Sequence, residues 1–168
     1  ARGDLDATSP FEFLTCLSPE ANDLRASVML ANDKIFNEEN KHEYSTACEL
    51  VVLAQVNAEV IWVQVGQPGL FLLRKGSPPL PLGTHLDLAL DVHPIDTPAD
   101  SPLPASLLGL HKTSNFSVHS ISAQKNDKIL LTTRTYMPAK FYSLNESTWN
   151  LDGLVQTLSH ENTDNPCR

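Results

Sequence analysis

The first helix is predicted by apolar residues that recur at helical spacing in the first quarter of the chain. From about Asn22 to Glu39, their period fits one face of an amphipathic helix. Five apolar residues share that face: Leu24, Val28, Met29, Ala31 and Ile35. Asn22 or Asp23 can cap the start of the helix. Residues 1–20 mix turn formers with short apolar pieces, so they are predicted to form an irregular N-terminal segment.

After residue 46 the pattern changes to short apolar runs, rich in β-branched residues, that are typical of strands. These runs predict strands over residues 47–57, 59–65, 70–74, 85–93, 116–123 and 128–133. The two-residue link Asn57-Ala58 suits a hairpin, and an antiparallel meander is the expected topology of the first four strands. Proline-rich residues 94–110 connect the two groups of strands, and a last helix is predicted over 148–160.

The size and composition of the chain predict one globular domain. Its 168 residues, 41% of them hydrophobic, can bury a real core, so a single α+β domain is expected over residues 1–168. Scattered aromatic residues, Trp62 and Trp149 among them, are predicted to fill that core.

Charge and hydropathy narrow the classes of partner. The formal net charge is −8, from 20 acidic and 12 basic residues, and the Lys and Arg residues do not cluster. Binding to a phosphate backbone needs concentrated positive charge, so no nucleic acid is expected as a partner. No apolar run approaches the roughly 18 residues that cross a bilayer, so no membrane span is expected either. Proteins or cations are the expected partners.

The cysteines and the missing motifs narrow the chemistry further. Cys16, Cys48 and Cys167 are widely spaced and form no Cys-x-x-Cys pair. Free thiols of a reducing compartment are the simplest interpretation, so a cytoplasmic location is expected. The sequence has no Gly-x-Ser-x-Gly elbow and no glycine-rich phosphate loop, which disfavours a nucleophilic hydrolase and a nucleotide-binding protein.

A series of motifs follows the first helix in a fixed order. Ser45-Thr46 and a strand come first, then VQVGQPGLFLLRKG (63–76), PLPASLLGL (102–110), NDKILLTTRTY (126–136), a helix, and TDNP (163–166). This series resembles the metal-dependent type 2C Ser/Thr protein phosphatases, above all their bacterial branch, over roughly Leu24 to Arg168. That family has a Val-Gly-Asp-Ser-Arg turn, a Leu-Pro to Leu-Gly connection, a Gly-Asp-x-Leu-Leu-Leu-x-Thr-Asp-Gly segment and a late Asp-Asn pair.

The resemblance implies a fold and a chemistry. The family's fold is an antiparallel β-sandwich flanked by helices, in four layers ordered α/β/β/α. Two divalent cations, Mn²⁺ or Mg²⁺, are held there by Asp carboxylates and activate a bridging water that attacks the phosphoryl group. The family's first strands, which carry its earliest Asp-Gly, have no match in this sequence. The fold is therefore expected to be incomplete.

The family's site residues are largely replaced here. Gln67 stands at the Asp of Val-Gly-Asp, after Gly66, so an amide replaces a carboxylate. Arg134 stands at the Asp of Thr-Asp-Gly and would put a fixed positive charge where a cation binds. Asp164 keeps the family's acidic residue. Gly66, Gln67, Arg134 and Asp164 are thus expected to mark a degenerate site with no catalytic residue and no metal.

The leading interpretation is a catalytically inactive phosphatase-like domain, a pseudophosphatase, that works in protein binding or regulation without a cofactor. Its partner is expected to be a protein, or a phosphoprotein if Arg134 contacts a phosphate. One alternative is an active Mn²⁺- or Mg²⁺-dependent Ser/Thr phosphatase completed by sequence outside this chain. The second alternative is an assembly domain whose open sheet edges pair in a dimer or with another chain.

Overall fold

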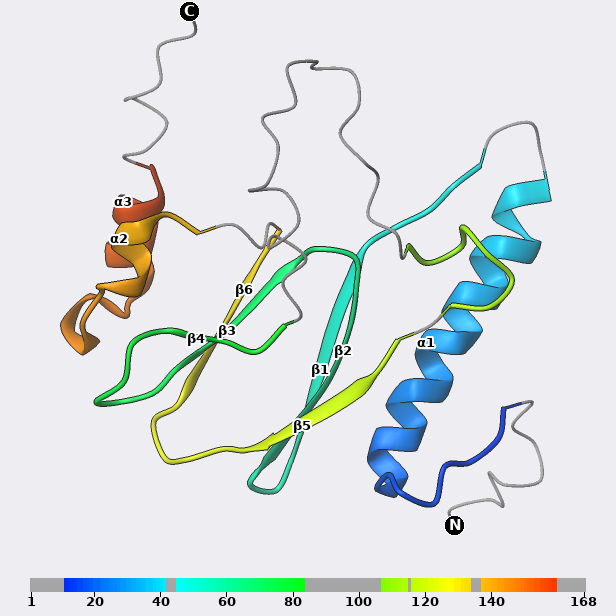
Figure 1. Cartoon of the computed structure of the whole chain (residues 1–168), viewed down its shortest axis with the longest axis horizontal. Coiled ribbons are helices and arrows are strands. Elements are labelled where there is room, and N and C mark those ends of the chain that lie inside the picture. Colours follow the sequence, from blue (N-terminus) through cyan, green and yellow to red (C-terminus); the bar gives the residue numbers. More distant parts are fainter. Residues whose placement is uncertain (1–10, 42–44, 84–106, 115, 134–136, 160–168) are drawn as a thin grey trace, which may run out of the picture. The chain divides into compact units, whose positions relative to one another are not determined.

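The computed structural model describes residues 11–41, 45–83, 107–114, 116–133 and 137–159 (Figure 1). These residues divide between two compact units. Unit 1 lies within residues 1–66 and 99–123, and unit 2 lies within residues 67–98 and 124–168. Each unit contains an antiparallel sheet and at least one helix, so the α+β class and the antiparallel sheets are confirmed. The single domain over 1–168 stays a prediction.

The sheet of unit 1 is built on one hairpin. Strand β1 (Leu50–Val56) pairs with β2 (Glu59–Val65), and β2 also pairs with β5 (Val118–Ser122), so the order is β1-β2-β5. The predicted hairpin link is confirmed: Asn57 has φ 55°, a left-handed conformation that Asn tolerates better than most residues. The bounds of β2 match the predicted strand 59–65 residue for residue.

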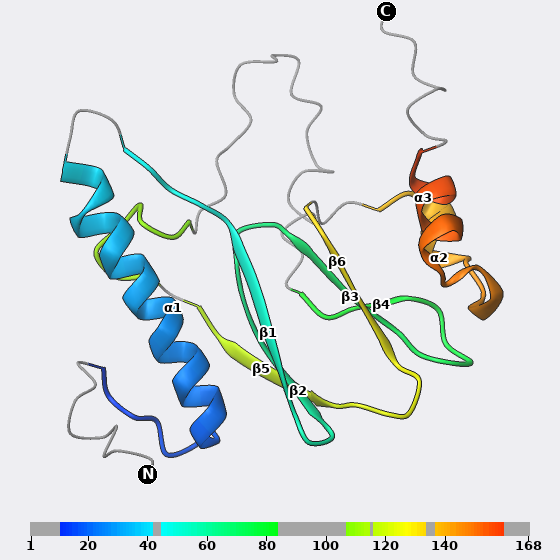
Figure 2. The same ribbon diagram turned by 180° about the vertical axis from the view of Figure 1, so that it is seen from behind.

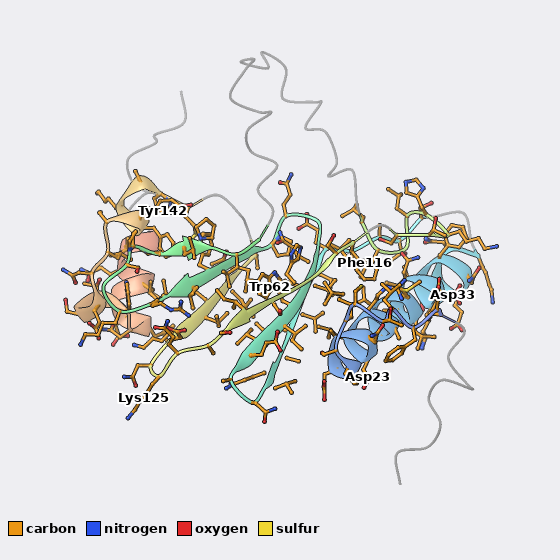
Figure 3. All side chains as sticks on the ribbon, turned by 60° about the horizontal axis from the view of Figure 1, so that its bottom comes forward. Asp23, Asp33, Trp62, Phe116, Lys125 and Tyr142 are labelled. Atoms are coloured by element: carbon orange, nitrogen blue, oxygen red, sulfur yellow. The ribbon has the colours of Figure 1, made fainter. Side chains whose placement is uncertain are left out.

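Helix α1 (Pro19–Asn37) packs on one face of this sheet (Figure 1). It begins three residues before the predicted start because Ser18 accepts a hydrogen bond from the Ala21 backbone N–H, and Pro19 fits the first helical turn. A short 3₁₀ helix, η2 (Glu39–Lys41), follows. The core beneath α1 consists of four buried residues: Val28, Val63, Val65 and Leu108. Figure 3 shows Phe116, which packs against this core, between the helix and the sheet.

Unit 2 pairs a second small sheet with short helices (Figure 2). Its strands are β3 (Gly69–Leu73), β4 (Leu80–Pro81) and β6 (Lys128–Thr132), in the order β4-β3-β6. Its helical segments are α2 (Ala139–Tyr142), η4 (Glu146–Thr148) and α3 (Leu151–Ser159). The core joins β3 to these helices through six buried residues: Phe71, Leu73, Met137, Phe141, Trp149 and Leu154. The prediction that Trp62 and Trp149 are core residues is confirmed, since they are 5% and 4% exposed.

The meander predicted for the first four strands is wrong at the connection from β2 to β3, and a second connection between different sheets joins β5 to β6. Strand β2 ends at Val65 and β3 begins at Gly69, yet they belong to different sheets, and so do β5 and β6. Each connection carries a left-handed residue, Gly66 (φ 84°) or Asn126 (φ 72°), which redirects the chain. Periodicity identifies a strand but not its partner. The predicted strand over 85–93 lies outside the described residues.

A buried amide fastens a distant loop to α1. Asn32, 3% exposed, accepts a hydrogen bond from the Gly109 backbone N–H at 2.8 Å. Its Nδ2 donates to the carbonyls of His111 and Lys112 at 3.1 and 3.2 Å. Gly109 has φ 84°, and an added Cβ would lie 2.1 Å from a methyl carbon of Ile35. This loop is the Leu-Gly connection of the motif series, so its position depends on α1.

Asn32→Ala is expected to lower the free energy of unfolding by about 2 kcal/mol or more, because it leaves the buried Gly109 N–H without its acceptor. Urea titration followed by circular dichroism measures the loss. Asn37→Ala, on the same helix, is the matched control: its amide contacts only the exposed Asp33 side chain, so about 0.5 kcal/mol or less is expected. Equal losses of unfolding free energy for the two variants would show that Asn32 does not hold the loop around Gly109 in place.

An ion pair closes the corresponding loop of unit 2. The Arg74 guanidinium contacts both carboxylate oxygens of Asp127, with Nη2 2.7 Å from Oδ2 and Nε 3.1 Å from Oδ1. The Gln124 backbone N–H donates to the same carboxylate at 2.8 Å. The hydrogen bonds from Arg74 are the main cause that lowers the pKa of Asp127, and desolvation partly opposes them. The end of β3 is thereby joined to the turn that precedes β6.

This ion pair should make stability depend on pH in the acid range. Because the folded-state pKa of Asp127 lies below its ordinary value, its contribution is complete above about pH 4 and is lost as the pH falls through the folded-state pKa. Asp127→Asn should lower the free energy of unfolding at pH 7. Between about pH 5 and pH 2, the free energy of unfolding of this variant should fall less steeply than that of the unchanged chain. Urea titrations at several pH values test this, with Asp33→Asn on α1 as the control. An unchanged acid slope in Asp127→Asn would refute the assignment.

Candidate functional site

The candidate site begins at the turn that leaves β2. Val65 ends the strand, Gly66 has φ 84°, and Gln67 and Pro68 lead into β3. An L side chain at position 66 would be strained by this φ, and its Cβ would lie 2.6 Å from Cγ of Glu49. Gln64 Nε2 donates to the Gly66 carbonyl at 3.4 Å. Glycine is therefore required at position 66 by both conformation and space.

Glu49 is a neighbour of this turn that sequence reasoning missed. Its Oε1 lies 2.9 Å from the place where a Gly66 Cβ would be. The hairpin register explains the contact: Leu50 is opposite Val65, so the preceding Glu49 falls opposite Gly66. That register follows from the Asn57-Ala58 link, so extending the predicted hairpin by one pair would have found Glu49.

The donor groups around the turn differ from those of a two-metal site. Gln67 has a neutral amide in place of the carboxylate that the resemblance implies, and Glu49, opposite Gly66 in the hairpin register, is a single carboxylate. Divalent Mg²⁺ and Mn²⁺ favour several anionic oxygen ligands. Within the described ranges, no three His, Cys, Asp or Glu side chains gather as a cation site requires. The residues described here therefore do not fit a two-metal centre.

The other two predicted site residues, Arg134 and Asp164, lie outside the described residues. Of the four predicted positions, the structure therefore places only Gly66 and Gln67, which are consecutive in the chain. Gly66 ends unit 1 and Gln67 begins unit 2. That Arg134 and Asp164 join them in one site stays a prediction.

Unit 1 also contains a cleft of about 150 Å³, lined by the end of the N-terminal segment and by β2 and β5. Its polar side chains are those of Cys16, Ser18, Glu59, His119 and Ser120. The His119 ring stacks on Trp62 with centroids 5.5 Å apart, and Figure 3 shows Trp62 in the sheet. Its histidine is thus used in ring packing across two strands, and the cleft brings together no set of residues with an evident catalytic arrangement.

Comparisons with solved structures identify the fold. One match is PppA, described as a key regulatory component of T6SS in Pseudomonas aeruginosa, with 22% identity and a TM-score of 0.55 over 68% of this chain and 50% of that one. Another is the serine/threonine phosphatase of S. agalactiae, with 16% identity and a TM-score of 0.52 over 72% of this chain and 52% of that one. The chain has a type 2C phosphatase-like fold. It spans about half the length of these two structures.

The sequence comparisons, unlike the structural ones, found no match. No protein-family model matches the chain, and no curated protein matches it. The TM-scores of 0.55 and 0.52 establish the fold, and at identities of 22% and 16% these matches show the fold alone. In the described part of the chain, no helix combines the length and apolar character that a membrane span needs.

Two residues of the phosphatase-like motif at the start of β6 have notable local structure, Asn126 in its backbone conformation and Asp127 in its ion pair. Asn126 stands where the family's Gly-Asp-x-Leu-Leu-Leu motif has glycine, and its φ of 72° is the conformation that glycine adopts most easily. Asn accepts this conformation at a lower cost than most residues do. Asp127, the acidic residue of the same motif, is bound by Arg74 as described above. The segment thus begins with a left-handed residue and a carboxylate held by an arginine.

Gly66→Ala should destabilise the fold more than Gly76→Ala. Both residues have positive φ, 84° and 78°, so both substitutions should cost about 1–2 kcal/mol from the left-handed conformation alone. A Cβ at Gly76 meets nothing within 4 Å, whereas one at Gly66 meets Glu49. Urea titration of both variants measures the difference. Combining Gly66→Ala with Glu49→Ala should reduce the excess cost, because it removes the contacts with Cγ and Oε1 and leaves only the Cβ of residue 49, at 2.9 Å. An undiminished cost would show that Glu49 is not its cause.

Proposed function

We propose that this chain is a non-catalytic type 2C phosphatase-like domain that acts by binding a protein. The observation that carries the proposal is the turn after β2. Gly66 there has the left-handed conformation that the crossing from one sheet to the other uses, but the residue that follows is Gln67. The backbone of a catalytic turn is retained, and the carboxylate that the chemistry depends on is replaced.

Gln67 in place of a carboxylate changes both the charge of the turn and its affinity for a divalent cation. A carboxylate supplies a full negative charge to a divalent cation, and an amide supplies only a dipole. If Arg134 lies near this turn, its guanidinium repels a cation and attracts an anion, such as the phosphate of a phosphoprotein. In this proposal the domain uses no metal cofactor, its partner is a protein, and it works in the cytoplasm.

One of the structural neighbours supports a regulatory role. PppA is described as a key regulatory component of T6SS, so a protein of this fold is described as taking part in regulation. We extend only the general role to this chain.

An active phosphatase is the second candidate. The S. agalactiae neighbour is a serine/threonine phosphatase, and this chain spans 52% of its length. In this alternative, further sequence supplies the missing carboxylates, and Mn²⁺ or Mg²⁺ supports hydrolysis. The two candidates differ in one readily measured property, the chelator-sensitive release of phosphate.

Restoring the carboxylate should restore cation affinity. Gln67→Asp is expected to bind Mn²⁺ at least about tenfold more tightly than the unchanged chain, an increase of roughly 1.4 kcal/mol. Isothermal titration calorimetry with MnCl₂ measures it, and hydrolysis of p-nitrophenyl phosphate is followed in parallel with and without EDTA. Gln55→Asp, an exposed position near the opposite end of the hairpin, is the matched control and should not gain affinity.

Two results would contradict the proposal, each in a different way. EDTA-sensitive hydrolysis by the unchanged chain would establish the active phosphatase in its place. Equal Mn²⁺ affinities for Gln67→Asp and Gln55→Asp would show that position 67 does not face a cation site, and the interpretation of this turn would then be wrong.

A further inference from the structure

The two sheets end in strands whose edges differ in their protection. In the described part of the chain, the outer strands are β1 and β5 in unit 1 and β4 and β6 in unit 2. Strand edges pair readily with other chains unless they are short, polar, charged or interrupted by proline. Three of the four edges carry such protection. β5 reads VHSIS, β4 has only two residues and ends in Pro81, and β6 begins with Lys128.

Strand β1 has none of these protections. It reads LVVLAQV over seven residues, with no charge, no proline and no glycine. Six of its seven residues are partly exposed and Gln55 is exposed, whereas five of the seven residues of the neighbouring strand β2 are buried. The bridge between Cys48 and Leu108 lies before β1 and does not cover residues 50–56. An apolar edge of this length is a strong template for strand addition.

We propose that β1 pairs with β1 of a second copy of this chain, antiparallel and centred on Leu53. In this register Leu50 lies opposite Val56, Val51 opposite Gln55, and Leu53 opposite its own copy. The residues that follow are Glu49 and Asn57, which would face each other across the interface. No like charges meet anywhere along the pair, although each chain has a net charge of −8. The uncharged edge is thus the place where two acidic molecules can approach.

The pairing is also consistent with the faces of the sheet. Directly opposite residues of an antiparallel pair lie on the same face, and Leu50 and Val52 pack against the core beneath α1. A second copy would extend the sheet to six strands with the core faces aligned. The two β2 strands would then be about 14 Å apart, three strand spacings, which exceeds the roughly 10 Å diameter of the helix on each. This interface does not depend on the chemistry of Gln67.

Introducing a positive or a negative charge at Leu53 tests the pairing. Sedimentation equilibrium of the unchanged chain should show a concentration-dependent mass that approaches twice 18.5 kDa. Leu53→Lys and Leu53→Glu should each weaken self-association at least about tenfold, because each places like charges opposite each other. An equimolar mixture of the two variants should recover the dimer, because opposite charges then face each other. This recovery also shows that the variants are folded.

Leu131→Lys is the matched control, since Leu131 lies on another outer strand and is 47% exposed. It should leave the dimer intact. A monomeric mass at every concentration would overturn the proposal and leave the β1 edge to another occupant. A dimer that Leu53→Lys and Leu53→Glu leave unchanged would overturn it as well, because the contact would then lie elsewhere. An equimolar mixture of the two variants that stays monomeric would also overturn it, because opposite charges at position 53 would then not restore the contact.

Discussion

The left-handed backbone at Gly66 is the constraint on which the rest of the arrangement depends. Its φ of 84° turns the chain out of β2, so that the next strand enters a different sheet within four residues. An L side chain there would meet both torsional strain and the Glu49 side chain. The change of sheet after β2 and the close approach of Glu49 to the turn both depend on this one conformation.

The connection from β5 to β6 also depends on a residue with left-handed backbone conformation. Asn126 adopts φ 72° between β5 and β6, and Asp127 is held by Arg74 from the end of β3. In unit 1, Asn32 plays the corresponding part by binding the loop around Gly109. Backbone conformation and buried polar contacts therefore hold the turns of this phosphatase-like fold in place.

The sequence predicted elements better than their pairing. The strand over 59–65 is recovered residue for residue because its apolar run is bounded by Asn57-Ala58 on one side and Gly66 on the other. The start of α1 is missed because Ser18 and Pro19 begin the helix before its apolar period does. The two-residue β4 and four-residue α2 are too short for any period. Sheet membership depends on contacts far apart in sequence, such as β3 with β6, which no local pattern encodes.

The candidate site was predicted only in part, and the hairpin shows why. Gly66 and Gln67 were found through a motif, whereas Glu49 belongs to no motif and is brought there by register alone. The same register places Glu49 at the end of the unprotected edge of β1. A strand that pairs with this edge would therefore bring its own chain close to Gly66.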